Sequence, residues 1–139
     1  MKLPSTPSFR LDGQRALVTG ASRGIGMGIA VALADAGAHV VLAARSGAEL
    51  EDIVQQIRQQ DGSAEAIELD VTDNEAVSSL INSQPVFDIL VNNAGIFPRV
   101  EFLKMTEDDW DSVFAVNLRG MFLCAHAAAK QMVSAGRSG

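Results

Sequence analysis

Tyrosine is absent from this sequence of 139 residues, and cysteine occurs only once, at Cys124. A single cysteine cannot form an internal disulfide, so we expect a protein of a reducing compartment. Basic side chains are also few: 11 Lys and Arg residues, scattered singly, stand against 17 Asp and Glu residues and leave a net charge of −6. This balance argues against a nucleic-acid partner, which requires a clustered excess of positive charge.

Long apolar segments are missing as well. No uninterrupted apolar run reaches the length that spans a bilayer, and the N-terminus lacks the apolar core of a signal peptide. We therefore expect a soluble, cytoplasmic protein without a membrane partner. The first eight residues, MKLPSTPS, predict a flexible tail. A composition of 47% hydrophobic and 20% charged residues predicts one globular domain over residues 9–139.

Short apolar segments alternate with helical patterns along this domain. Strands are predicted over residues 16–19, 39–43, 64–69 and 88–91, and the first two have the continuous apolar character of strands covered on both faces. Helices are predicted over residues 25–36, 50–57, 77–81 and 110–135, the last with a bend near Gly120. Thr106 and Asp109 have the spacing of a capping box, so we expect the last helix to begin there. The alternation predicts an α/β fold with a doubly wound parallel sheet.

Glycines 20, 24, 26 and 28 follow the first predicted strand. The N-terminus of the next helix offers unpaired N–H groups and a partial positive charge, which together favour a phosphate. Gly20 would let the chain turn, Gly24 would let the backbone approach a ligand, and Gly26 would let the helix pack closely. Gly20, Gly24 and Gly26 therefore predict a phosphate-binding turn, with an ordinary tight turn as the alternative.

The chain resembles the classical short-chain dehydrogenases/reductases in three motifs. Residues 19–26, TGASRGIG, match the cofactor motif T-G-x-x-x-G-x-G of that family. Residues 92–95, NNAG, match a second motif directly after the fourth predicted strand, and Asp70 matches the aspartate at the end of the third. The resemblance extends over residues 9–139 and implies a Rossmann-type fold that includes the first four strands and stops before the fifth.

The resemblance also implies where a nicotinamide dinucleotide would bind. The pyrophosphate would lie over Gly20, Ser22, Arg23, Gly24, Ile25 and Gly26. The adenine would lie beside Asp70 and Val71, and Asn92, Ala94 and Gly95 would line the ribose and nicotinamide side. Asn117 matches the active-site asparagine, whose backbone kink holds a water of the proton relay; the alternative is a capping or turn residue before Gly120. No metal site is expected.

The end of the second predicted strand bears on the choice of cofactor. NAD-binding sites carry an acidic residue there, which hydrogen-bonds the ribose 2′-hydroxyl. This chain carries Arg45 and Ser46 instead, and a guanidinium is suited to a 2′-phosphate. Arg23 could add a second positive charge. NADP is therefore predicted, with NAD as the alternative if Arg45 is only a solvated residue at the start of a helix.

In the resembled family, catalysis depends on a serine after the fifth strand and on a Tyr-x-x-x-Lys motif, and this chain contains no tyrosine. The resemblance implies an NADP-dependent oxidoreductase that transfers hydride between the nicotinamide and a carbonyl or secondary alcohol. A 3-oxoacyl thioester or a sugar or polyol would be such a substrate, and a homodimer or homotetramer the expected assembly. The chain alone is expected to be inactive. The alternative is a non-catalytic dinucleotide-binding fragment.

Overall fold

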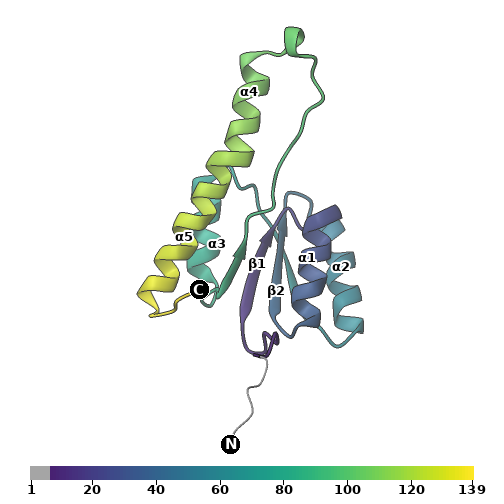
Figure 1. Ribbon diagram of the computed structural model, residues 1–139, viewed down its shortest axis with the longest axis vertical. Helices are drawn as coiled ribbons and strands as arrows, with labels where there is room; N and C mark the ends of the chain where they lie inside the picture. The colour runs from purple at the N-terminus through teal and green to yellow at the C-terminus, as the bar shows by residue number, and fades with distance from the viewer. Residues whose placement is uncertain (1–6) are drawn as a thin grey trace, which may run out of the picture.

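A four-stranded parallel sheet forms the centre of the computed structural model, which describes residues 7–139 (Figure 1). Its strands are β1 (Arg15–Thr19), β2 (His39–Ala44), β3 (Ser63–Glu68) and β4 (Ile89–Val91), in the spatial order β3-β2-β1-β4. The parallel sheet and all four predicted strands are thus confirmed, with shifts of one residue at several ends. Most of the predicted tail, residues 1–6, lies outside the described residues.

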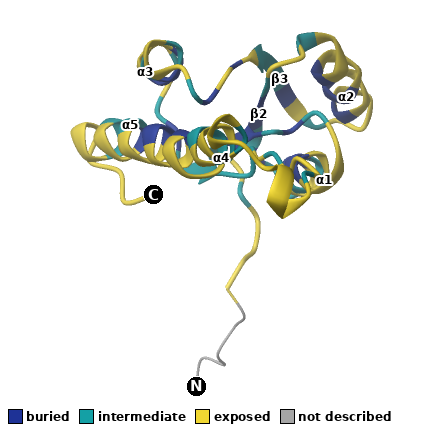
Figure 2. Ribbon diagram, turned by 90° about the horizontal axis from the view of Figure 1, so that it is seen from above, coloured by how far each residue is buried: buried dark blue, intermediate teal, exposed yellow. Residues whose placement is uncertain are grey.

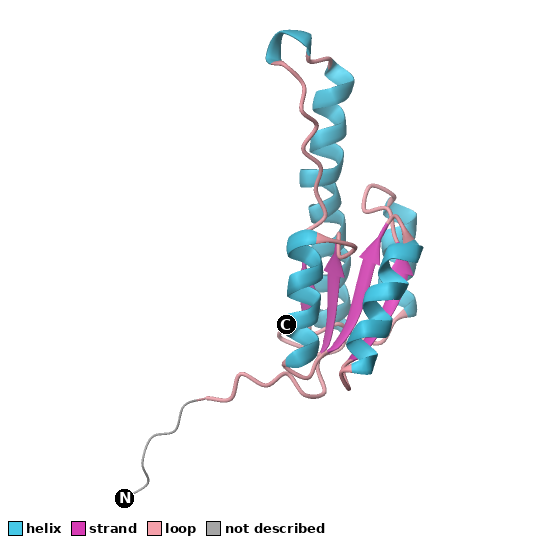
Figure 3. Cartoon of the chain, turned by 90° about the vertical axis from the view of Figure 1, so that its right-hand side faces the viewer, coloured by secondary structure: helices cyan, strands magenta, loops and turns pink. Residues whose placement is uncertain are grey.

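Alternate residues of the central strands point to opposite faces of the sheet and enter two separate cores. Ala16 and Val18 belong to the core under α1 (Gly24–Asp35) and α2 (Gly47–Gln59). Leu17 belongs to the core under α3 (Asn74–Ser83) and α5 (Met121–Ser134). Because both faces are buried, the strands need no polar alternation, which explains their continuous apolar sequences. In Figure 1 the sheet lies between these two helical layers, with α3 and α5 on the left and α1 and α2 on the right. Figure 3 looks onto the side that α1 and α2 cover.

The last helical region is one continuous helix from Glu107 to Ser134, 28 residues long. It consists of α4 (Glu107–Phe114), a π-helical segment η2 (Ala115–Gly120) and α5. Thr106 caps it through the predicted capping box with Asp109. Near Gly120, where the sequence predicted a bend, the winding changes to the π-helical form of η2. A short 3-10 helix, η1 (Phe102–Lys104), precedes α4, and this region rises beyond the sheet (Figure 1).

By length and composition alone, this helix could cross a membrane. The sequence analysis did not predict this, because charged residues interrupt its apolar runs. Its inner face packs on α3 and the sheet through Leu123, Cys124 and Ala128. It therefore serves as a layer of the α/β fold. Its outer face is exposed (Figure 2) and includes Trp110, Phe114, Leu118, Met121 and Phe122.

Candidate functional site

A cleft of about 480 Å³ opens at the carboxyl ends of the parallel strands. This is the edge at which open α/β sheets bind their ligands, and the volume lies in the usual range for ligand pockets. The cleft is lined by most of the predicted cofactor residues: Gly20, Ser22, Arg23, Ile25, Gly26, Arg45, Ser46, Asp70, Val71, Ala94 and Gly95. The fold thus brings together Gly20 and Gly95, which are 75 positions apart in the chain.

The glycine turn between β1 and α1 forms one wall of the cleft. Gly20 and Gly24 have φ angles of +65° and +57°, a left-handed conformation that glycine adopts without strain. A Cβ at Gly26 would overlap the carbonyl oxygen of Gly20 and the side-chain amide of Asn93, so only glycine permits this packing. Within residues 7–139, no side chain caps the N-terminus of α1, and its first turn carries no acidic residue. Its N–H groups and the positive end of its dipole are therefore available to an anion.

Two polar residues of the quoted motifs, to which the sequence analysis assigned no role, hold this turn against the strand end of β4. The buried Thr19 hydroxyl donates to the Val91 carbonyl at 3.3 Å and accepts the N–H groups of Asn93 and Ala94, both at 3.1 Å. The Asn93 amide donates to the carbonyls of Thr19 and Gly20 at 3.1 and 3.0 Å. The glycine turn and the NNAG segment therefore form one hydrogen-bonded unit. The sequence signal that could have revealed this role is a threonine, Thr19, at the end of an otherwise apolar strand.

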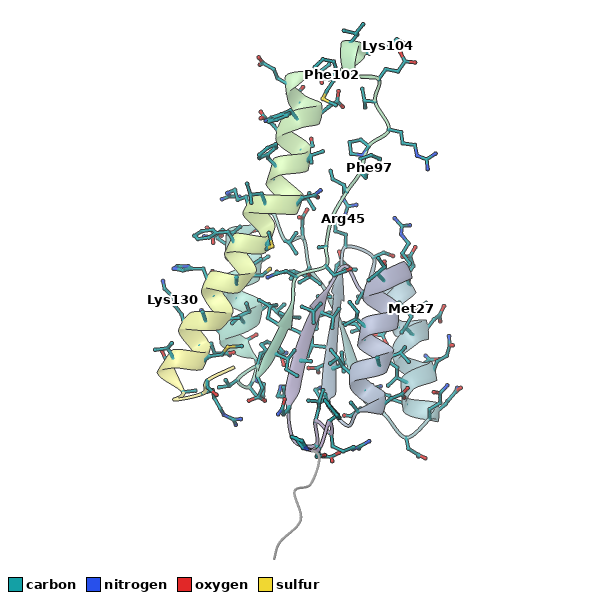
Figure 4. All side chains as sticks on the ribbon, in the orientation of Figure 1. Met27, Arg45, Phe97, Phe102, Lys104 and Lys130 are labelled. Atoms are coloured by element: carbon teal, nitrogen blue, oxygen red, sulfur yellow. The ribbon has the colours of Figure 1, made fainter. Side chains whose placement is uncertain are left out.

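Charged groups gather at the other end of the cleft. Arg45 follows β2 directly and is exposed at the carboxyl end of the sheet (Figure 4). The Thr72 N–H and hydroxyl donate to Asp70 Oδ1 at 2.9 and 2.7 Å. These two bonds, and to a lesser extent the charge of Arg45, hold the pKa of Asp70 below its ordinary value, so its carboxylate is ionised near neutral pH. Glu49 also lines the cleft and brings a negative charge that the analysis of the strand end missed.

Asn117 lies in η2, next to the cleft rather than in its lining. Its Oδ1 accepts the Ile96 N–H at 2.8 Å, and its Nδ2 donates to the Ile96 carbonyl at 2.9 Å. Ile96 and Val116, which were not predicted, do line the cleft. Asn117 therefore joins the long helix to the segment that follows NNAG, and a turn or capping role does not describe this arrangement.

Comparison with known proteins identifies this architecture. The family profile of short chain dehydrogenases matches residues 14–139. The chain belongs to the short-chain dehydrogenase family. Versicolorin reductase stcU from Emericella nidulans is 41% identical over 140 aligned positions, which cover 97% of this chain and 53% of the relative.

Two crystal structures of family members share this fold. A short-chain type dehydrogenase/reductase from Mycobacterium marinum superimposes with a TM-score of 0.91 at 39% identity, covering 95% of this chain and 55% of that one. A gluconate 5-dehydrogenase from Burkholderia cenocepacia, in complex with NADP and tartrate, gives a TM-score of 0.85 at 38% identity, with coverages of 93% and 52%. The Rossmann-type fold is therefore confirmed. The chain spans about half the length of the curated relatives it matches.

Two predicted residues of the short-chain dehydrogenase motifs, Gly24 and Asn92, are not in the cleft lining. Gly24 is the first residue of α1, and a Cβ placed on it would meet no atom within 4 Å among the described residues. Asn92 follows β4 directly and is half-buried. The contacts that these two residues would make with a dinucleotide stay predictions.

Proposed function

We propose that this chain is the cofactor-binding part of an NADP-dependent oxidoreductase that transfers hydride between a nicotinamide and a carbonyl or secondary alcohol. The single observation that carries the proposal is the cleft in which the glycine turn, Arg45 and the NNAG segment meet. Family membership supports the reaction class, and the relative crystallised with NADP supports the cofactor.

The residues of the cleft fit such a cofactor. The uncapped N-terminus of α1 and the open space over Gly24 would receive the pyrophosphate, since backbone N–H groups and the helix dipole favour an anion. Asp70 and Val71 would border the adenine, and Ala94 and Gly95 the ribose and nicotinamide side. The bound nicotinamide would supply or accept the hydride.

Arg45 supports NADP over NAD, because its guanidinium offers a fork of N–H donors suited to a dianionic phosphate. Ser46 and Arg23 line the same cleft and would add a hydroxyl and a second positive charge. Glu49 opposes this preference, although its place in the first turn of α2 is also explained by the helix dipole. The cleft lining carries two arginines and two carboxylates, Glu49 and Asp70, so the preference depends on the position of Arg45 directly after β2 rather than on the net charge.

Asn117 is the residue of this chain that we assign to the chemistry itself, as the support of a water in a proton relay. Its amide is held in place by the two hydrogen bonds to Ile96. The proton donor, which the resemblance assigns to a tyrosine, has no counterpart in a chain without tyrosine. A non-catalytic dinucleotide-binding fragment, favoured by that same absence, is the second candidate.

Calorimetric titration of the 139-residue chain with NADPH and with NADH tests the cofactor. We expect NADPH to bind more tightly. Equal affinities would remove the argument from Arg45, and no binding of either nucleotide would overturn the proposed function.

The exposed outer face of the long helix supports assembly into a homodimer or homotetramer. Five large apolar side chains, Trp110, Phe114, Leu118, Met121 and Phe122, are between 43% and 59% exposed there. A patch of this kind is typical of a surface that another protein surface covers. Sedimentation velocity of the chain and of Phe122→Glu tests this proposal, and we expect the substitution to shift the protein toward monomer.

A further inference from the structure

The π-helical segment η2 makes contacts toward both ends of the cleft within a single turn. Asn117 and Arg119 provide side-chain hydrogen bonds, and Gly120 provides a backbone contact. Single π-helical turns inside α-helices are uncommon and occur frequently at functional sites, where they re-aim the groups that they carry. These contacts reach two separate segments of the cleft, one beside Asp70 and one after NNAG.

Toward the Asp70 end, η2 rests directly on the cleft wall. Gly120 is buried, and a Cβ placed on it would lie 2.7 Å from Val71 Cγ2 and 3.2 Å from the Val71 carbonyl oxygen. Val71 is 7% exposed and lines the cleft. The Arg119 Nη1 donates to the Thr72 carbonyl at 3.0 Å, one residue further on. The helix backbone can approach this closely only because residue 120 has no side chain.

Toward the NNAG end, the same turn holds Ile96. The two hydrogen bonds of 2.8 and 2.9 Å between the Asn117 amide and the Ile96 backbone form a cyclic pair. Val116, also in η2, lines the cleft beside Ile96. Only three positions separate Asn117 from Gly120, so a shift of one contact moves the other.

We propose that η2 is a brace that sets the separation between the two ends of the cofactor cleft, with Gly120 and Arg119 as positioning residues for Asn117 and Ile96. The inference rests on the proposed function for the identity of the ligand. A side chain at position 120 displaces η2 from Val71 and carries Asn117 and Ile96 with it. A ligand that spans the cleft then loses more affinity than one that occupies only the Asp70 end.

The test compares Gly120→Ala with Gly28→Ala, which makes the same change in α1 where a Cβ meets nothing within 4 Å among the described residues. Each variant is titrated calorimetrically with NADPH and with 2′,5′-ADP, which lacks the nicotinamide half. We expect Gly120→Ala to weaken NADPH binding about tenfold, the size of effect that overpacking of a tight contact produces, and 2′,5′-ADP binding clearly less. We expect Gly28→Ala to change neither. Equal losses for the two ligands, or no loss, would overturn the brace.

Two further variants keep the test decisive if Gly120→Ala fails to fold. Arg119→Ala removes the bond to Thr72 from an exposed side chain without adding bulk, and should produce a smaller loss with the same preference for NADPH. In the double variant Gly120→Ala/Val71→Ala, the added Cβ gains the space of the missing methyl groups. NADPH affinity should then return toward that of Val71→Ala alone.

Hydrogen exchange of the Ile96 amide separates this inference from the proposed function, since it requires no ligand. In the free protein, the Ile96 amide hydrogen should exchange faster in Gly120→Ala and in Arg119→Ala than in the parent chain. In Gly28→Ala its exchange rate should be unchanged. Unchanged exchange would overturn the brace even if cofactor binding is normal. Failure of the parent chain to bind either nucleotide would instead overturn the proposed function, and the exchange rates would still decide the brace.

Discussion

Arg45 and Glu49 bring opposite charges to the same cleft, four positions apart in the chain. The carboxylate of Glu49 stabilises the N-terminus of α2, where a negative charge is favourable without any ligand. The guanidinium of Arg45 is exposed, and no hydrogen bond or ion pair engages it within residues 7–139. A bound phosphate would give this side chain a partner. We therefore expect Arg45 to determine the preference between NADP and NAD.

Replacing Arg45 with Asp should invert or erase the preference for NADPH. The substitution removes a donor from the 2′-phosphate and adds an acceptor suited to a ribose 2′-hydroxyl. We expect NADPH affinity to fall about tenfold or more, since charge-assisted bonds contribute roughly 1.5–3 kcal/mol each. Calorimetry with both cofactors measures the ratio. Arg99→Asp, the same charge change at an exposed residue outside the cleft lining, is the control and should leave the ratio unchanged.

Gly24→Val should abolish cofactor binding without complete unfolding. The branched side chain would occupy the open space over the helix N-terminus, and it would strain a backbone with φ of +57°. Gly136→Val provides a matched control, because Gly136 has φ of +67°, is equally open and lies outside the cleft lining. Both variants should lose thermal stability by similar amounts, but only Gly24→Val should lose cofactor binding. Retained binding in a folded Gly24→Val protein would limit the glycine to a role in the turn.

Among the elements, the long helix differs most from a simple periodic pattern. The sequence predicted one helix with a bend, whereas the structure contains α-, π- and α-helical segments in succession over Glu107–Ser134. The outer end of this helix rises beyond the sheet and has few tertiary contacts, so its start depends on local interactions. The capping box of Thr106 and Asp109 supplies these interactions. The Thr106 N–H donates to Asp109 Oδ2 at 2.9 Å, and the Asp109 N–H donates to the Thr106 hydroxyl at 3.2 Å.

Thr106→Ala should destabilise the start of α4, whereas Thr106→Ser should retain the cap. Loss of an N-cap hydroxyl costs about 1 kcal/mol, and thermal unfolding measures the difference between the two variants. The Thr106 N–H and hydroxyl hold the pKa of Asp109 below its ordinary 3.8. The stabilisation by this carboxylate is therefore complete above that value and is lost as the pH falls through the lower folded pKa. The stability difference between the parent and Thr106→Ala should shrink in that acidic range by the part that the hydroxyl donates to the Asp109 carboxylate, whereas the bond from the Asp109 N–H to the hydroxyl remains. A difference that does not change with pH would contradict this account.

At the scale of the whole molecule, the described chain holds a cofactor cleft and no tyrosine to complete a catalytic centre. Reduction of a ketone builds negative charge on the carbonyl oxygen, and the barrier falls only when a positioned acid and hydrogen-bond donors meet that charge. Asn117 can support a water but is not an acid. Lys104 and Lys130 have no tyrosine at the spacing that the resemblance requires.

The 139-residue chain should therefore reduce no carbonyl substrate above background, even where it binds NADPH. The absorbance of NADPH, followed with a panel of ketones, aldehydes, sugars and β-ketoacyl thioesters, measures this. A longer chain that adds the segment carrying serine and Tyr-x-x-x-Lys should restore turnover. Equal turnover by the short and the longer chain would place the proton donor within residues 1–139 and would contradict the proposed division of roles.

Local sequence determined the elements and the motifs of this protein. Continuous apolar runs predicted β1 and β2 to within one residue, because strands buried on both faces tolerate little else. The TGASRGIG and NNAG segments predicted the main walls of the cleft, since their backbone requirements are local and each follows directly from a strand. The capping box could also be predicted from the sequence, because its two partners are only three positions apart.

Only the tertiary structure decided how these segments meet. The Thr19 and Asn93 network joins residues more than 70 positions apart, and the contact of Gly120 with Val71 joins a helix to a strand end through the lack of a side chain. No periodic pattern in the sequence predicts either contact, because both depend on how the sheet places separate loops at one edge. The same holds for Glu49, which no prediction named and whose place in the cleft follows from the packing of α2 on β2 and β3. The motifs specified most of the groups that line the cleft, and packing added Glu49, Ile96 and Val116 and set the distances between them.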